Sequence, residues 1–269
     1  MLKRRLITGL IFILLAVWAI LGLPSFYFGF ALGLLVAIGA WEWAGLIGLA
    51  LPLQRFFYSL LVLFCVWAVA AYLPVMAVLA AACLWWLVSL VWVMRFPAGR
   101  SLWANSLIGS LAGLFVLVPP WIALMALHEG DSRGPYFVLF LLVMIWLADT
   151  AAYFAGRRWG SRRLAPQVSP GKTWEGLWGA TLAVMFYALV SGMLVFTGAG
   201  VLTFMLLCLV TLWFSILGDL VESMFKRQAG VKDSGRLLPG HGGLLDRIDS
   251  LTAAAPVFVL SLLLSGMLK

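Results

Sequence analysis

The chain has 269 residues, of which 64% are hydrophobic and only 10% are charged, and its mean hydropathy is +1.09. Soluble domains carry about a quarter charged residues, so this composition excludes an ordinary soluble protein and indicates a polytopic membrane protein. The formal net charge is +8. The basic residues stand in short segments beside apolar runs, which argues against nucleic acid as a partner.

Nine apolar windows are predicted to cross the bilayer, because a spanning helix needs about 20 apolar residues. Short proline or glycine breaks separate several windows, so their boundaries are approximate. We therefore expect an all-α polytopic membrane protein with about nine transmembrane helices. The windows are approximately 6–23, 26–48, 56–71, 74–94, 105–127, 135–155, 173–197, 199–220 and 250–267.

Basic residues are distributed unevenly between alternate connecting segments. If the N-terminus is cytoplasmic, 16 lysines and arginines fall inside, and two, Arg133 and Lys269, fall outside. This asymmetry follows the positive-inside rule. The segment after the eighth window is therefore expected to face the cytoplasm, and the net charge is mainly topological.

Polar residues are rare in the first half of the chain. Glu42 lies within the second window, where a charge is costly, and we expect it to hydrogen-bond to a neighbouring helix rather than to act in catalysis. His128 opens a short polar outer turn and is expected to be solvated. The three cysteines lie in apolar windows without metal-ligand spacing, so no disulfide is expected.

Two polar motifs precede the eighth window. Asp149 ends an apolar run just before four arginines, where capping or charge pairing competes equally with a functional role. The segment Ser169–Gly176 reads SPGKTWEG, and it places Lys172, Thr173 and Glu175 at the start of the seventh helix. Backbone amides at a helix N-terminus suit a phosphate. An N-capped helix with a snorkelling lysine would also explain this motif alone, and the glycine-rich run of a P-loop is missing.

Charge is concentrated between Asp219 and Asp249. These 31 residues hold five of the ten carboxylates, five of the eighteen basic residues and one of the two histidines. Asp219, Glu222 and Ser223 share a helix face by their spacing, and Asp246 and Asp249 share another where the last helix begins. Two helices therefore bring carboxylates to one membrane depth, beside a loop rich in cations and glycines.

This arrangement is typical of metal-dependent phosphoryl or nucleotidyl transfer. Magnesium binds through one or two carboxylates together with substrate phosphates, and neighbouring cations neutralise the polyphosphate. A salt-bridged loop with solvated charges is the alternative. Because charges are so scarce elsewhere in the chain, we favour the functional interpretation.

The same stretch matches a known signature over 27 residues. It reads S-x-x-K-R-x4-K-D-x5-P-x-H-G-G-x-x-D-R-x-D and closely resembles the phosphatidate cytidylyltransferase (CDP-diacylglycerol synthase) family. SPGKTWEG and Asp149 with AAYFAG resemble that family too, so the resemblance covers roughly the C-terminal half; the first half matches only in hydropathy and WEWA. Gly171 departs from it, because many relatives carry a second lysine there. The matched residues are Ser223, Lys226, Arg227, Lys232, Asp233, Pro239, His241, Gly242, Gly243, Asp246, Arg247 and Asp249.

The resemblance implies a reaction of CTP with phosphatidic acid, giving CDP-diacylglycerol and pyrophosphate, at the cytoplasmic face of a bacterial inner membrane. It implies a transmembrane scaffold at 1–130 and a transmembrane catalytic region at 131–269, within one integrated membrane domain, with a polar active-site cavity on the cytoplasmic side. A homodimer is one option, although no residue specifies an interface. Mg²⁺, with a second cation as a further option, is expected at Asp219, Asp246 and Asp249.

Roles for the other site residues follow from the same resemblance. Lys226, Arg227 and Lys232 would neutralise the triphosphate, and His241 would donate a hydrogen bond or organise its loop. Substrate contacts are expected from a second group of residues around these. That group comprises Ser169, Lys172, Thr173, Glu175, Ser223, Asp233, Gly242, Gly243 and Arg247.

Two other functions remain open from the sequence. A CTP-dependent polyprenol or phytol kinase would have a lipid hydroxyl attack the γ-phosphorus and would release CDP instead of pyrophosphate. A transporter is compatible with intramembrane carboxylates, but charge is confined to one side of the C-terminal half. The motif of CDP-alcohol phosphotransferases is absent from the sequence.

Overall fold

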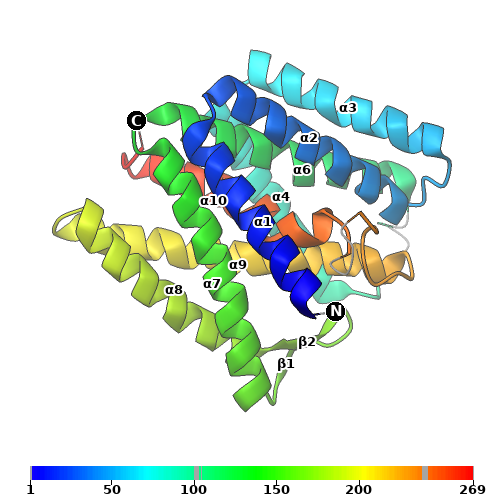
Figure 1. Cartoon of the computed structure of the whole chain (residues 1–269). Helices are drawn as coiled ribbons and strands as arrows, with labels where there is room; N and C mark the ends of the chain where they lie inside the picture. The colour runs from blue at the N-terminus through cyan, green and yellow to red at the C-terminus, as the bar shows by residue number, and fades with distance from the viewer. Residues whose placement is uncertain (1, 100–102, 104, 238–241, 269) are drawn as a thin grey trace.

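The computed structural model describes residues 2–99, 103, 105–237 and 242–268 (Figure 1). Within this part of the chain, the regular structure consists of long helices and one short hairpin. The helices are α1 (Leu2–Gly22), α2 (Ser25–Leu46), α3 (Pro52–Tyr72), α4 (Val75–Arg95), α6 (Ser106–Gly130), α7 (Gly134–Trp159), α8 (Trp174–Val195), α9 (Ala199–Gln228) and α10 (Leu245–Leu264). The strands are β1 (Arg163–Ala165) and β2 (Ser169–Thr173).

The predicted all-α polytopic architecture is confirmed. Among the described residues, eight helices, α2 to α10, are long and apolar enough to cross a membrane. The first predicted window coincides with α1, whose described apolar part, Ile13–Gly22, is shorter than a span. The ninth crossing therefore stays a prediction.

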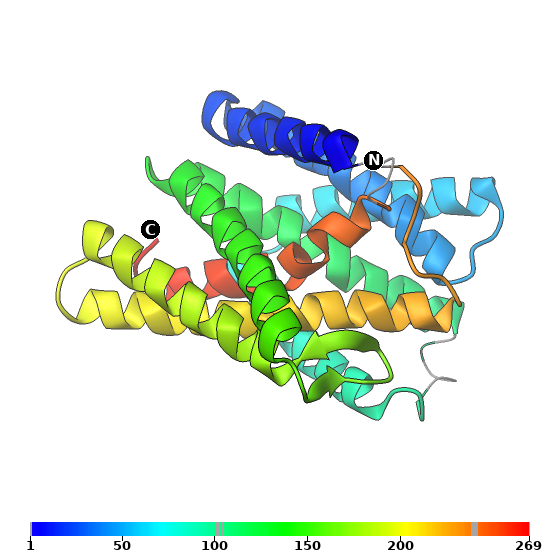
Figure 2. The ribbon, with the colours of Figure 1, turned by 60° about the horizontal axis from the view of Figure 1, so that its bottom comes forward.

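The helices run alternately in opposite directions. Both views place the N-terminus, the β1–β2 hairpin and the segment after α9 toward one side, and the C-terminus toward the other (Figures 1 and 2). α6 and α10 are central, because 61% and 56% of their apolar windows are buried, whereas α3 is peripheral with 17%. The peripheral helices keep large apolar side chains on their outer surface, such as Phe64 and Trp67, as expected where lipid replaces water as the solvent.

Two hydrophobic clusters form the interior. One joins α6, α7, α9 and α10 around Phe140, Phe204 and Phe258. The other joins α2, α4, α6 and α9 around Trp43 and Trp86, and the Trp43 indole donates a hydrogen bond to the Gly109 carbonyl at 2.9 Å. The second cluster includes Phe225 and Leu245, which are next to Lys226 and Asp246, so it packs around the ends of the helices that hold the polar residues.

The hairpin between α7 and α8 was not predicted. Its strands pair antiparallel, with Arg163 opposite Thr173 and Ala165 opposite Ser169. The motif SPGKT was expected to be a simple break before a helix, but it forms the second strand. Thr173 then caps α8, because its hydroxyl accepts a hydrogen bond from the Gly176 amide at 3.1 Å.

The prediction of a solvated His128 is wrong. The ring is buried at the end of α6 and stacks on Phe28, with 4.3 Å between the ring centroids. Its Nδ1 lies 3.0 Å from the Ser25 hydroxyl and its Nε2 lies 3.0 Å from the Ile20 carbonyl. His128 therefore joins α6 to α1 and α2. The prediction failed because the polar residues around His128 in the sequence do not reveal that two other helices lie beside its ring.

The helices that bear the charges are longer than their apolar windows. α9 continues to Gln228, eight residues beyond the predicted window 199–220. The apolar window stopped early because the last two turns of α9 carry polar and charged residues among apolar ones. α10 begins at Leu245, before the predicted window 250–267. Lys226 and Arg227 consequently stand on a rigid helix, and the loop that was expected to start with them starts only after Gln228.

Candidate active site

α9 and α10 come into close contact at Gly218. An added Cβ at Gly218 would stand only 2.5 Å from the Asp249 backbone carbonyl and 3.1 Å from the Ala253 side chain. This glycine lets the two helix backbones approach closely. The contact lies one residue before Asp219, so it brings the acidic faces of the two helices together.

Five carboxylates are neighbours along this contact, and we call them the acidic cluster. They are Asp149, Asp219, Glu222, Asp246 and Asp249. The negative charge of Asp219 acts on both Asp149 and Asp249, and Glu222 interacts with Asp249 and Asp246. The expectation that α9 and α10 bring their carboxylates together is therefore met, with α7 adding Asp149.

The first cation of the cluster comes from the hairpin. The Nζ of Lys172 lies 2.6 Å from Asp219 Oδ2, and the Ser223 hydroxyl donates to Asp219 Oδ1 at 3.2 Å. Both partners of the ion pair remain about one quarter exposed. Ser223 therefore shares a face with Asp219 as its spacing predicted, whereas the contact of Lys172 with Asp219 was not predicted. The Lys172–Asp219 pair can be reached from solvent.

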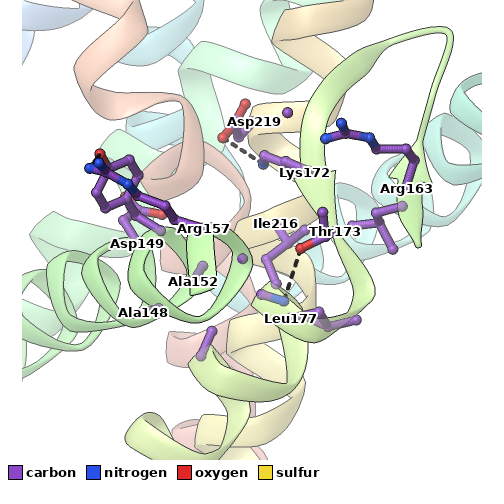
Figure 3. Close-up of a pocket in the computed structure, with 16 residues that line it drawn as sticks. Ala148, Asp149, Ala152, Arg157, Arg163, Lys172, Thr173, Leu177, Ile216 and Asp219 are labelled. Atoms are coloured by element: carbon purple, nitrogen blue, oxygen red, sulfur yellow. Dashed lines mark hydrogen bonds and ion pairs between the residues drawn. The ribbon is translucent and has the colours of Figure 1, made fainter. Parts of the chain in front are cut away.

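A cavity of about 510 Å³ opens beside this ion pair. Asp149 and Arg157 line it from α7, and Lys172 and Asp219 line it from β2 and α9, where they form the ion pair drawn in Figure 3. Arg163 lines it from β1. Three cations around one polar opening make it suitable for a group with several negative charges.

The second cation is enclosed within the cluster. Lys226 Nζ lies 2.6 Å from Asp246 Oδ1 and 3.4 Å from Glu222 Oε1, and the exposed fraction of its side chain is 12%. Glu222 is 2% exposed, and within the described part of the chain neither of its oxygens accepts a hydrogen bond. Lys226 therefore balances buried negative charge, in addition to any role toward a phosphate.

The remaining oxygen of Asp246 holds the connecting segment before α10. Its Oδ2 accepts hydrogen bonds from the Ser234 amide at 2.9 Å, the Ser234 hydroxyl at 3.1 Å and the Gly243 amide at 2.8 Å. Gly242 adopts φ +84°, a conformation that favours glycine. The predicted Gly242 and Gly243 thus shape the backbone beside a carboxylate that Ser234 contacts from the segment after α9.

Other predicted residues are not among those that line the polar cavity. The Nε of Arg227 donates to the Val168 carbonyl in the hairpin turn at 3.2 Å. Lys232 and Asp233 are exposed on the segment after α9. Predicted residue His241 lies outside the described residues, as does Pro239.

Two predicted residues of the SPGKTWEG motif have local structural roles. Glu175 accepts hydrogen bonds from the Ser161 hydroxyl at 2.6 Å and from the Arg162 amide. Ser169 pairs with Ala165 in the hairpin. These contacts fix the path of the chain between α7 and α8, and so they hold Lys172 in position.

An apolar cavity of about 440 Å³ begins beside α10. Its walls come mainly from α1, α2 and α7, and α10 adds Arg247, Ile248 and Leu251. Arg247 also interacts electrostatically with Asp149, which lines the polar cavity. One arginine therefore stands between an apolar space and a polar one.

The acidic cluster suits a magnesium ion by its chemistry. In the described residues, no three acidic, histidine or cysteine side chains form a ready-made metal cage. Magnesium is usually held by one or two carboxylates plus substrate phosphates, so a full cage is not required. The carboxylates of Asp219, Asp246 and Asp249 are oxygen donors of the kind that such an ion prefers, and Asp219 remains about one quarter exposed.

Sequence reasoning missed three residues of this site. Ser234 contacts two carboxylates, yet a single serine in a polar segment carries no distinctive signal. Arg157 and Arg163 were counted only as topological charges, although both line the polar cavity. Their role depends on the hairpin, which turns the chain back over the end of α7.

Comparisons with known proteins agree with this geometry. The sequence pattern of the cytidylyltransferase family matches residues 3–265. The chain is 42% identical over 270 residues to a phosphatidate cytidylyltransferase of Pseudomonas aeruginosa, covering 99% of this chain and 98% of the relative. It is 38% identical over 280 residues to one of Haemophilus influenzae, covering 96% and 97%. A Staphylococcus epidermidis phosphatidate cytidylyltransferase is 46% identical over 136 residues, about half of each chain. The chain belongs to the cytidylyltransferase family.

Proposed function

We propose that the protein transfers a cytidylyl group from CTP to phosphatidic acid, giving CDP-diacylglycerol and pyrophosphate. The observation that carries this proposal is the similarity to phosphatidate cytidylyltransferases along nearly the whole of both chains. The described structure supports it, because it has a cavity lined by cations and an apolar cavity, and Arg247, which lines the second, interacts electrostatically with Asp149, which lines the first. A nucleoside triphosphate and a lipid phosphate need these two environments side by side.

The reaction is an in-line displacement at the α-phosphorus of CTP. An oxygen of the phosphatidate phosphate forms a bond to this phosphorus, and the bond from the α-phosphorus to the β-phosphate oxygen breaks, so that pyrophosphate leaves. A phosphate monoester has a second pKa of about 6, so the nucleophile is largely ionised near neutral pH. A strong general base is therefore unnecessary.

The basic residues of the chain would neutralise the triphosphate and the leaving pyrophosphate. Lys172, Arg157 and Arg163 face the polar cavity from two sides. Lys232 is exposed on the segment after α9, where it can meet an incoming nucleotide. Charge neutralisation by positioned cations supplies much of the catalysis in such transfers.

The acidic cluster would hold Mg²⁺, through Asp219, Asp246 and Asp249. When bound, the ion would polarise the phosphoryl oxygens and neutralise charge that develops on them. Asp219 is paired with Lys172, and Asp246 with Lys226. Each lysine lies beside its carboxylate, where it would be near a phosphate held by the Mg²⁺ ion that the carboxylate binds.

The acyl chains of phosphatidic acid would occupy the apolar cavity between α1, α2 and α7. Its lining is almost entirely hydrocarbon, and it includes Arg247. A guanidinium in the wall of an apolar cavity suits a lipid phosphate by charge complementarity. The lipid would then present its headgroup to the polar cavity while its tails stay in a membrane-like environment.

The site would face the cytoplasm of a bacterial inner membrane. The hairpin, the segment after α9 and the N-terminus lie toward one side (Figures 1 and 2), and 16 of the 18 basic residues were assigned to that side. The positive-inside rule supports a cytoplasmic orientation, which also gives CTP direct access.

One assay tests the activity directly. Purified protein is incubated with CTP labelled at the α-phosphate, phosphatidic acid and Mg²⁺, and the lipid fraction is scored for label together with pyrophosphate release. Labelled lipid with equimolar pyrophosphate is the expected result. In a parallel reaction with a polyprenol in place of phosphatidic acid, release of labelled CDP together with unlabelled polyprenyl phosphate would instead identify a lipid kinase, which the relatives do not favour.

A further inference from the structure

A carboxylate from the first half of the chain reaches the N-terminus of α10. Glu42 lies near the end of α2 and is 5% exposed. Its Oε1 accepts the Leu244 amide at 3.0 Å and its Oε2 accepts the Leu245 amide at 2.8 Å. α10 begins without a capping side chain of its own, so Glu42 caps it from another helix.

The first amides of a helix need hydrogen-bond acceptors, and the positive end of the helix dipole attracts an anion. Both needs are met here by one buried carboxylate that is more than 200 residues away in sequence. α10 carries Asp246 and Asp249 in its first turns. The contact with Glu42 thus fixes the first turn of α10, and with it the positions of these two carboxylates.

Glu42 is also linked to Asp246 through one hydroxyl. The Ser234 Oγ lies 3.0 Å from Glu42 Oε2 and 3.1 Å from Asp246 Oδ2. A serine hydroxyl has a single proton, so the two carboxylates share it. A shift of the Glu42 carboxylate would therefore be felt at Asp246 directly as well as through the helix.

The backbone leaves space for this carboxylate. A Cβ at Gly235 would overlap the Glu42 side chain, and a Cβ at Gly243 would overlap both Glu42 and the Ser234 hydroxyl. Neither glycine has a positive φ angle. At these two positions the absence of a side chain is required by Glu42 and not by the backbone conformation.

We propose that Glu42 is a positioning residue for the reaction: it fixes the N-terminus of α10 and the segment around Ser234, and thereby the acidic cluster and the cations beside it. This proposal rests on the proposed function for its kinetic consequence. Its structural consequence, protection of the first α10 amides, is independent of any activity. Both can be measured on the same purified enzyme.

The test compares Glu42→Gln with Glu129→Gln. Glutamine is isosteric and keeps one acceptor oxygen, but its NH2 group would face the Leu245 amide donor. Glu129 is an exposed residue near the end of α6 and serves as the matched control. We expect E42Q to lower kcat per folded molecule at least tenfold, with the KM for phosphatidic acid within twofold of wild type, and E129Q to change neither.

Hydrogen exchange gives the readout that needs no substrate. In E42Q, the amides of Leu244 and Leu245 should exchange at least tenfold faster, while the amides at the start of α8 are unchanged. If E42Q fails to fold, Gly235→Ala replaces it, because the added methyl presses on the same carboxylate; Gly33→Ala on α2, where a Cβ meets nothing within 4 Å, is its control.

The outcomes separate the two proposals. A wild-type enzyme that makes no CDP-diacylglycerol overturns the proposed function, whereas faster exchange in E42Q would still support the capping contact. Slower turnover with faster exchange supports a positioning role. A kcat within twofold of wild type, or unchanged exchange at Leu244 and Leu245, overturns it.

Discussion

Lys226 Nζ on α9 lies 2.6 Å from Asp246 Oδ1 on α10. Both side chains are largely buried, and the same ammonium lies 3.4 Å from Glu222. This contact joins the two helices that carry most of the acidic cluster, so its loss should be visible in stability as well as in turnover.

Replacing Lys226 by methionine should destabilise the protein. Removing one member of a buried ion pair costs about 3–5 kcal/mol, because the partner charge is left uncompensated. Thermal unfolding in detergent should show a clearly lower Tm for K226M. Lys232→Met is the control for stability, since Lys232 is exposed; K232M should keep the wild-type Tm and raise the KM for CTP. Equal Tm values for K226M and wild type would contradict the structural role of this pair.

Replacing Asp246 by asparagine should remove most turnover while the protein stays folded at the assay temperature, although its Tm should fall as in K226M because the same buried ion pair is lost. The carboxylate accepts three hydrogen bonds at Oδ2 and an ion pair at Oδ1. An amide cannot accept at both positions, and it offers a weaker ligand to Mg²⁺. We expect a loss of at least a hundredfold in kcat, measured with labelled CTP, and an unchanged elution profile on size exclusion. Near-normal activity of D246N would refute the metal role.

A methyl group at Gly243 should displace the side chains of Ser234 and Glu42 and so disturb the acidic cluster. The added Cβ would overlap the Ser234 hydroxyl and the Glu42 carboxylate, both of which contact the segment before α10. G243A is expected to lose at least tenfold in kcat/KM for CTP. Gly33→Ala, which meets open space on α2, should behave as wild type. Full activity of G243A would mean that this segment moves freely during turnover.

A lysine at Gly171 should improve nucleotide binding. Gly171 lines the polar cavity, and a Cβ there meets nothing within 4 Å. A further cation beside Lys172 would add charge for the triphosphate, so the KM for CTP should fall severalfold with kcat unchanged. The effect should shrink at high salt because exposed charges are screened. Gly171→Met, of similar bulk without charge, is the control, and an equal KM for both variants would contradict the prediction.

Hydropathy alone predicted the helical membrane architecture, because each crossing must bury its own backbone hydrogen bonds and so leaves a long apolar run. Asp219, Ser223 and the α10 carboxylates were also placed correctly, since spacing defines a shared helix face. Lys172 was expected at the start of a helix, but it reaches Asp219 from strand β2. The hairpin at Arg163–Thr173 could not be predicted, because its short strands carry no alternation of apolar residues. His128 was misplaced for a related reason: its partners, Ser25 and the Ile20 carbonyl, belong to other helices.

Through Glu42, the position of the last helix depends on the second helix. A break in the turn after α6, near Arg133, would leave one fragment with the carboxylate and the other with the amides that it binds. Neither fragment alone would hold its acidic residues in register. The two pieces would regain activity only when produced together in one membrane, and a fragment carrying Glu42→Ala would fail to complement its partner.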